Sequence, residues 1–345
     1  MFSFKKITKS DWHHQIEQDI APRTIHDLSP KIIEGISNLP FAHPEDLTFD
    51  ISSKLPQRRD NSWLITYEIN KKDFTDLNKC LLQALKYGAE AIHFVLRRIP
   101  DAQELNVMLS DVRLDWFESL WSFDGVIEDI SLKNFEVDII QMFPELQSEK
   151  CRIFNNNNKS IALNATFKID IPNLSDGESS MEDWAKILKD IGVALERIDN
   201  SIKPIIFFIK GTNNILWNII QIRSFKLLYL KLMECYTLPS KHPKIHFGVH
   251  PKMLGLDPHV NLIRSTSIGL SGIIGGIDYL DIPGNGRESI DSLWQMSAIH
   301  LQYILREEGK LGELDDPLKG SYYIESMTEE LCRKVWHLFQ QMHES

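Results

Sequence analysis

Residues 204–249, PIIFFIKGTNNILWNIIQIRSFKLLYLKLMECYTLPSKHPKIHFGV, contain two short apolar runs on either side of a longer segment. The runs 204–209 and 245–249 are apolar at consecutive positions, which indicates strands covered on both faces, as in a parallel sheet. Residues 214–236 lie between them and predict a long, largely apolar helix. The stretch therefore predicts a strand, helix and strand unit of an α/β fold.

The same unit recurs along the chain. A helix is predicted over 77–87, where Gly88 stops it, and a strand follows over 91–96. The other predicted strands are 116–123, 165–171 and 277–282, and the other predicted helices are 131–143, 181–199, 260–274, 290–307 and 327–341. This alternation indicates a (β/α)8 TIM-type barrel more than an open sheet. No Gly-x-Gly-x-x-Gly follows a predicted strand, which weakens the alternative of a dinucleotide-binding sheet.

Residues 1–60 have a different character from the rest of the chain. A helix is predicted over 10–20, and five prolines interrupt the segment that follows it. Such a segment cannot form a core alone. We therefore expect an extended amino-terminal arm over 1–60 that docks on a partner, and a barrel domain over 61–345 that includes a closing carboxyl-terminal helix.

The composition argues against several classes of function. The 345 residues carry a formal net charge of -10 with scattered basic residues, so the positive field that nucleic acid requires is missing. No window approaches the roughly 20 apolar residues of a membrane span, and we expect a cytoplasmic protein. The four cysteines form no Cys-x-x-Cys pair, so a metal or disulfide framework finds no support.

Polar residues on the predicted strands and helices are the first candidates for a site. His242, His246 and His250 lie close together in the sequence, and His246 and His250 have the spacing of a helical metal pair. Residues 245–249 predict a strand instead, on which residues four apart lie about 13 Å apart, and no nearby Glu completes a zinc site. No metal site is therefore expected. His246 could face a pocket at the carboxyl end of its strand or be a core histidine. Arg223, on a largely apolar helix, requires a carboxylate, a carbonyl or an anionic ligand, so a structural ion pair and a ligand contact both stay open.

Two later segments look like ligand motifs. Asp257-Pro258-His259 begins like the Asp-x-His-x-x-Gly motif of cobalamin-binding domains, but Leu262 stands where the Gly should be, and too few residues follow for such a domain. Asp257-Pro258 is instead expected to begin a helix. Gly275-Gly276 falls between a predicted helix and a predicted strand, which is the ordinary place for a helix stop, although a phosphate-binding role is an alternative.

Three segments of the barrel domain resemble the methylmalonyl-CoA mutase family. Residues 315–325, DDPLKGSYYIE, resemble a family signature. Residues 213–223, NNILWNIIQIR, resemble its Asn-Tyr-Phe-Met-Glu-Ile-Ala-Lys-Leu-Arg helix, and residues 257–266, DPHVNLIRST, its Asp-Pro-Tyr-x-Asn-x-x-Arg-x-Thr segment. The signature positions are expected to be structural, and they are Asp257, Asn261, Arg264, Gly275, Gly276, Asp316, Gly320, Tyr322 and Tyr323.

The arm makes the resemblance more specific. Trp12, Asp19, Glu34-Gly35-Ile36 and Pro40 are similar to the opening of the family's small, non-catalytic subunit. The resemblance thus implies the small subunit of a methylmalonyl-CoA mutase, shortened to its barrel domain.

Departures from the family pattern bear on activity. Glu68 stands where catalytic members have a Tyr near the migrating group, and Pro172 stands where they have a His that hydrogen-bonds the thioester carbonyl. Gly248 replaces a Gln two residues after His246, and Asp281 lies in the segment that replaces Ser-Leu-His-Thr. The resemblance therefore implies degenerate active-site positions and no catalytic residue. His246 and Arg223 are left as candidates for a vestigial acyl-CoA pocket.

The implied complex is adenosylcobalamin-dependent and interconverts methylmalonyl-CoA and succinyl-CoA. No cofactor is expected in this chain. Adenosylcobalamin is expected in a large catalytic subunit, which this chain would stabilise as a heterodimer, and the isolated chain could also form a homodimer. Two alternatives stay open: a barrel chain that is itself catalytic while a separate chain carries cobalamin, and a pseudoenzyme that binds acyl-CoA.

Overall fold

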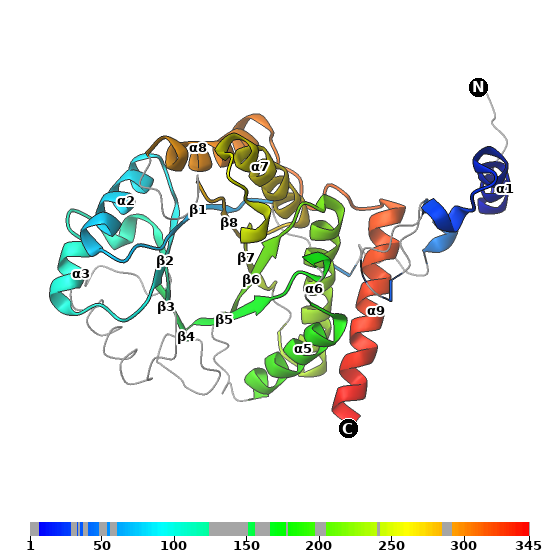
Figure 1. Cartoon of the computed structure of the whole chain (residues 1–345). Coiled ribbons are helices and arrows are strands. Elements are labelled where there is room, and N and C mark those ends of the chain that lie inside the picture. Colours follow the sequence, from blue (N-terminus) through cyan, green and yellow to red (C-terminus); the bar gives the residue numbers. More distant parts are fainter. Residues whose placement is uncertain are drawn as a thin grey trace.

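The computed structural model describes residues 7–28, 33, 35–36, 41–47, 54–55, 61–123, 151–155, 166–176, 179–196, 205–239, 242–284 and 292–344. Its centre is a closed barrel of parallel strands in sequence order, in which β8 pairs with β1 (Figure 1). The strands are β1 Leu64–Ile69, β2 Ala91–Leu96, β3 Glu118–Phe123, β4 Cys151–Asn155, β5 Thr166–Ile171, β6 Ile205–Gly211, β7 Lys244–Val249 and β8 Tyr279–Asp281. The predicted TIM-type barrel is confirmed.

Helices surround the barrel on its outer side (Figure 1). The helices around the strands are α2 Phe74–Lys86, α3 Ala102–Met108, α5 Met181–Glu196, α6 Ile215–Cys235, α7 Pro258–Gly275 and α8 Ser292–Tyr303. Helix α9 Tyr322–Glu344 packs outside α5 and α6, and helix α1 Lys9–Ile20 projects away from the barrel. A π-helical turn, Ile304–Glu308, continues α8. Within the described residues, no helix is both long and apolar enough to cross a membrane. The predicted helix over 131–143 lies outside the described residues.

Most predicted elements fall within a few residues of the observed ones, and the exceptions have local causes. Helix α9 begins at Tyr322, five residues before its predicted start, because the left-handed Gly320 ends the preceding turn. Strand β3 begins at Glu118 because Leu114–Trp116 form a short 3-10 turn. Helix α3 and strand β4 were not predicted, since seven and five residues give too little periodicity to recognise.

Alternation along the strands divides the core into an outer layer and the barrel interior. Ile65 and Ile69 of β1 face outward and pack with the buried side chains of α2 and α3. Ala91, Leu120 and Ile206 belong to a separate cluster that fills the interior. Helix α6 lies between the barrel and α9, so 14 of its 21 residues are buried. That position explains why its sequence is apolar on nearly every side.

The amino-terminal ends of the outer helices are capped by side chains. Asp73, Asp101 and Asp257 each accept hydrogen bonds from two backbone N–H groups at the start of α2, α3 and α7, and Asn214 accepts one from Trp217 at the start of α6. These caps satisfy amide groups that have no partner within the helix.

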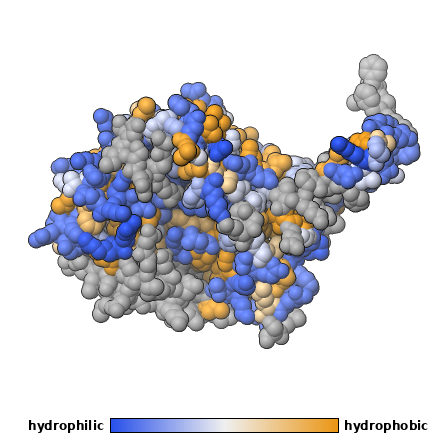
Figure 2. Space-filling view, viewed as in Figure 1, coloured by the Kyte–Doolittle hydropathy of each residue, from blue (hydrophilic) through white to orange (hydrophobic). Residues whose placement is uncertain are grey.

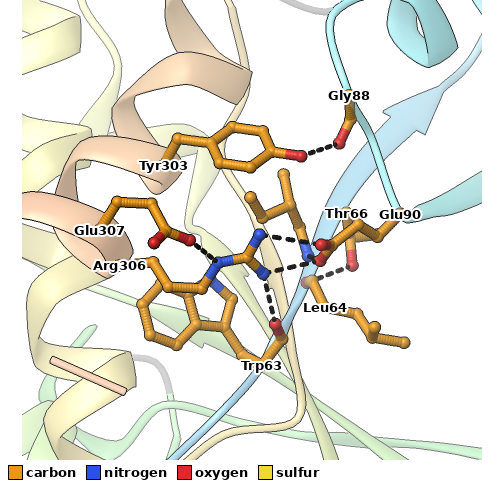
Figure 3. Close-up of polar contacts among 9 residues, drawn as sticks. Trp63, Leu64, Thr66, Gly88, Glu90, Tyr303, Arg306 and Glu307 are labelled. Carbon is orange, nitrogen blue, oxygen red and sulfur yellow. Dashed lines mark hydrogen bonds and ion pairs between the residues drawn. The ribbon is translucent and has the colours of Figure 1, made fainter. Parts of the chain in front are cut away.

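A polar cluster ties the end of α8 to the amino-terminal end of the barrel wall (Figure 3). Arg306 donates to both carboxylate oxygens of Glu90 at 2.8 and 2.9 Å, and Glu90 in turn accepts from the backbone N–H of Ile65 at 3.0 Å. Tyr303 donates from its hydroxyl to the Gly88 carbonyl at 2.8 Å. Because these contacts join α8 to β1 and β2, they hold the last helix of the barrel against the first two strands.

The first part of the described arm, which contains α1, projects away from the barrel (Figure 1). Helix α1 has no buried residue, and Trp12 on it stacks on Phe41 with ring centroids 4.1 Å apart. Figure 2 shows hydrophobic and hydrophilic side chains interleaved on this projection. Ile33 and Ile36 are instead buried in the core cluster that contains α9. The arm is thus anchored near α9 while its first helix leaves the body of the protein.

Candidate functional site

The carboxyl end of a parallel barrel is where active sites of this architecture lie. In this protein that end holds a group of polar side chains, each contributed by a different strand. They are Glu68 of β1, His93 of β2, Ser122 of β3, Lys210 of β6 and Asp281 of β8. The strand alternation directs them inward, because Ile65 and Ile69 of β1 and Ile209 of β6 face the outer helices. We call these five residues the mouth cluster.

Glu68 is the centre of the mouth cluster. Its carboxylate oxygen Oε2 lies 3.7 Å from Nδ1 of His93 and 3.8 Å from Nζ of Lys210, and its backbone N–H donates to Asp281 Oδ1 at 3.0 Å. The residue is only 8% exposed. A buried carboxylate requires nearby cations or donors, and the Lys210 ammonium lies at ion-pair distance from it. The carboxyl group that stands in place of the family's Tyr therefore lies against groups of the chain itself.

Aromatic rings fill the barrel below this cluster. His246 is fully buried and stacks on Phe208 with centroids 4.4 Å apart, and the ring of Tyr279 lies 6.1 Å away on a nearly parallel plane. His93 lies 5.3 Å from His246 and shares a 2.8 Å hydrogen bond with the Ser122 hydroxyl. His246 is therefore packed in the interior beneath the mouth rather than lining its rim.

The amino-terminal end of the interior is closed by a separate ionic group. Arg152 of β4 pairs with Glu118 of β3, and Tyr279 of β8 donates its hydroxyl proton to the same carboxylate. Burial and the nearby Glu118 carboxylate raise the pKa of Tyr279. Tyr279 is fully buried and the Arg152 and Glu118 side chains are part-buried. Because the three bind one another, this group joins β3, β4 and β8.

Pro172 and Gly248, the other two degenerate positions, have no polar side chain. Pro172 follows β5, and its carbonyl accepts a 2.8 Å hydrogen bond from the indole nitrogen of Trp184 on α5. Gly248 lies in β7 beside Lys210 of β6. A Cβ atom at Gly248 would lie 2.9 Å from the Lys210 ammonium nitrogen, so that ammonium takes the space that a side chain there would need.

Arg223 does not belong to a pocket. It is 1% exposed on α6 and donates to Glu325 of α9 at 2.9 Å, and it also pairs with Asp316. Glu325 accepts a further hydrogen bond from the backbone N–H of Gly320 at 3.1 Å. The structural ion pair was therefore the correct alternative, and the prediction of Arg223 as a vestigial pocket residue is wrong. The contact joins two signature segments that are about a hundred residues apart.

Several other signature positions make contacts within the fold. Asn261 donates to the Gly255 carbonyl and accepts from the Gly255 N–H, and Arg264 donates to the Met253 carbonyl, which together hold the loop before α7. Tyr323 packs against the main core cluster, while Tyr322 is 44% exposed.

Gly275-Gly276 has the predicted role of a helix stop. Gly276 ends α7 in the left-handed conformation with φ of 81°. A Cβ at Gly275 would lie 2.8 Å from the Ile222 side chain, so α6 and α7 need a small residue there. Lys226 of α6 donates its ammonium protons to the carbonyls of Gly275 and Gly276. A cation at a helix carboxyl end is favourable, and no phosphate is needed to explain the glycines.

The residues with metal or cobalamin potential have other roles. Among the described residues, no group of three His, Cys, Asp or Glu side chains could hold a metal ion. His250 accepts from the N–H of Lys252 as the cap of a short 3-10 turn. Asp257 accepts from the backbone N–H of His259, whose ring lies 5.1 Å from that of Trp294. The Asp257 carboxylate therefore caps α7 instead of binding the His259 imidazole as the cobalamin motif would require.

Comparisons with known proteins agree with this signature. Residues 188–345 match the family model of methylmalonyl-CoA mutase. The methylmalonyl-CoA mutase small subunit of Porphyromonas gingivalis is 22% identical over an alignment that covers 97% of this chain and 63% of that protein. This chain is a relative of the methylmalonyl-CoA mutases. A methylmalonyl-CoA mutase of Cereibacter sphaeroides is 29% identical over 48% of this chain and 25% of that protein.

The chain thus spans less than two-thirds of the length of either of these mutase relatives. Among solved structures, dihydropteroate synthase from Thermus thermophilus aligns with a TM-score of 0.39 and 9% identity, over 72% of this chain and 95% of that one. A likeness of that size has no bearing on function.

Sequence reasoning missed part of the mouth cluster in this mutase relative. Lys210, His93 and Ser122 were not singled out, although Lys210 and His93 are polar residues within otherwise apolar strands. An inward-facing polar residue near the carboxyl end of a barrel strand is the signal that could have found them. The distances between these three side chains depend on how the barrel closes, and the sequence of a single strand does not show this.

Proposed function

We propose that this chain is the non-catalytic small subunit of an adenosylcobalamin-dependent methylmalonyl-CoA mutase and that it stabilises a large catalytic subunit. The observation that carries the proposal is the mouth of the barrel. Glu68, Pro172 and Gly248 replace the Tyr, His and Gln of the family pattern, and the donors that the mouth does hold, Lys210 and His93, lie beside the Glu68 carboxylate.

Two observations support the role of a subunit. The alignment with the Porphyromonas small subunit extends over nearly the whole chain, arm included. Helix α1 has no buried residue, yet it carries Trp12, which stacks on Phe41. Aromatic side chains held on a projecting helix are suited to contact a second surface. The arm is therefore the proposed docking element for the large subunit.

The proposal also assigns the cofactor to the partner. In this chain Asp257 caps α7, and Leu262 stands in place of the motif's Gly, so these residues do not fit a cobalt-ligating histidine. Absorbance titration of the purified chain with adenosylcobalamin should show no saturable spectral change. A saturable shift at micromolar cofactor would mean that cobalamin binding was assigned to the wrong chain.

Co-purification tests the docking arm directly. The chain would be co-expressed with a large mutase subunit, once intact and once without residues 1–55, and each mixture would be separated by size exclusion. We expect a complex with the intact chain and a weakened one with the truncated chain, while circular dichroism shows that the truncated barrel is still folded. A matched control, Ile304→Ser, changes an exposed aliphatic residue of the barrel and should leave pairing intact. If the folded truncation pairs as well as the intact chain, the arm is not the docking element.

A further inference from the structure

The Lys210 side chain crosses the mouth of the barrel to reach Glu68. Lys210 is on β6 and Glu68 on β1, and β7 and β8 lie between these two strands in the sheet. The ammonium nitrogen nevertheless lies 3.8 Å from the Glu68 carboxylate. The lysine side chain is 28% exposed and the glutamate side chain 5%, so the lysine covers the carboxylate on the solvent side.

Gly248 makes this crossing possible. Lys210 and Gly248 are direct neighbours across the β6 and β7 ladder. A Cβ at Gly248 would meet Nζ of Lys210 at 2.9 Å and its Cδ at 3.5 Å. Gly248 is not among the residues with positive φ, so its backbone would accept another residue. The lysine stem, and not the backbone conformation, is therefore the reason why a glycine fits here.

The backbone that carries Lys210 is held firmly. Its carbonyl accepts a 2.9 Å hydrogen bond from the Asn173 side chain, and Thr212 just beyond β6 donates its N–H to Asn218 at 3.1 Å. Gly211 allows no side chain, since a Cβ there would lie 2.3 Å from the Phe247 ring. The end of β6 is fixed by these contacts, so the direction of the Lys210 side chain is set by the fold.

We propose that Lys210 is an intramolecular ligand of Glu68 and that the cleft it occupies, over Gly248 and against the Glu68 carboxylate, is a binding site for a primary alkylammonium group. In the native chain the lysine occupies this site and keeps external molecules out. The inference concerns this chain alone and does not rest on the proposed function.

Chemical rescue tests the site. Lys210→Ala removes three methylenes and the ammonium group, which together correspond to propylammonium. Added propylammonium should raise the thermal midpoint of Lys210→Ala, because a ligand that binds only the folded state stabilises it. Propan-1-ol, which has the same chain without charge, should not. The native protein, whose site is filled, and Lys210→Ala combined with Glu68→Gln should not respond to propylammonium.

Lysine labelling supplies a second measurement that does not require the Lys210→Ala variant to fold. Amine acylation followed by mass spectrometry should modify Lys210 several-fold more slowly than Lys186, which is 64% exposed on α5. Gly248→Ala should raise labelling of Lys210 several-fold and leave Lys186 unchanged, since the new Cβ displaces the ammonium. Equal labelling of Lys210 in the native protein and in Gly248→Ala would overturn the proposal, as would a Lys210→Ala protein that propylammonium does not stabilise.

Discussion

The ion pair between Arg223 and the signature residues offers the sharpest test of how the signature stabilises the fold. We expect Arg223→Met to destabilise the protein strongly, because it leaves the Glu325 carboxylate buried without its cation. Breaking a buried pair by removing one partner costs about 3–5 kcal/mol. The lower end, about 3 kcal/mol, applies here because Glu325 keeps the hydrogen bond from Gly320 and the Asp316 side chain is 18% exposed. Methionine preserves most of the packing of the arginine stem.

Urea unfolding followed by tryptophan fluorescence and circular dichroism measures this loss as a lower midpoint at an unchanged slope. The matched control is Arg113→Met, which removes the same charge from an Arg113–Asp115 pair whose arginine side chain is 56% exposed. Exposed pairs contribute about 0–1 kcal/mol, so the control should unfold nearly as the native protein does. If Arg223→Met costs no more than Arg113→Met, the signature does not stabilise the fold through this pair.

Two other predictions follow from the same structure. Gly276→Ala should lower the free energy of unfolding by about 1–2 kcal/mol, because Gly276 ends α7 at φ of 81°. The control Gly255→Ala changes a glycine without positive φ and should alter the unfolding midpoint little. Equal losses in the two variants would contradict the role of Gly276 as a left-handed helix end. Burial raises the pKa of Tyr229 to about 12 from its ordinary value of 10.0. The folded state thus retains the phenol proton better than the unfolded state, so stability is complete below pH 10 and is lost as the pH rises toward 12. At pH 11 the loss from this group is on the order of 1 kcal/mol. Urea unfolding at pH 9 and 11 should show this decrease, and Tyr229→Phe should reduce it; an equal decrease in both proteins would refute the contribution.

The consecutive apolar runs explain why the barrel could be predicted. Strands β6 and β7 are covered on both faces, so 204–209 and 245–249 are apolar without alternation, and the helix between them is long enough to recognise. Short elements carried too little signal. Strand β4 has five residues, and its central Ile153 follows an arginine that pairs inside the barrel.

The site was less predictable because its contacts join distant residues. Arg223 had an evident need for a carboxylate. Its partner Glu325 lies 102 residues further along the chain, so the sequence could not choose between this carboxylate and an external ligand. Lys210 and Glu68 meet only because the barrel closes and because Gly248 leaves room between them. Glu68 and Gly248 were recognised as departures from a family pattern, whereas their physical connection through Lys210 required the fold.

The most direct test of the proposed non-catalytic role is an isomerisation assay on the purified chain. The chain alone would be incubated with methylmalonyl-CoA and adenosylcobalamin, and product would be followed by chromatography, with a large mutase subunit as the positive control. We expect no succinyl-CoA above the protein-free blank from the chain alone, and turnover from the large subunit with this chain bound. Turnover by the unmodified chain alone, above that blank, would contradict the account.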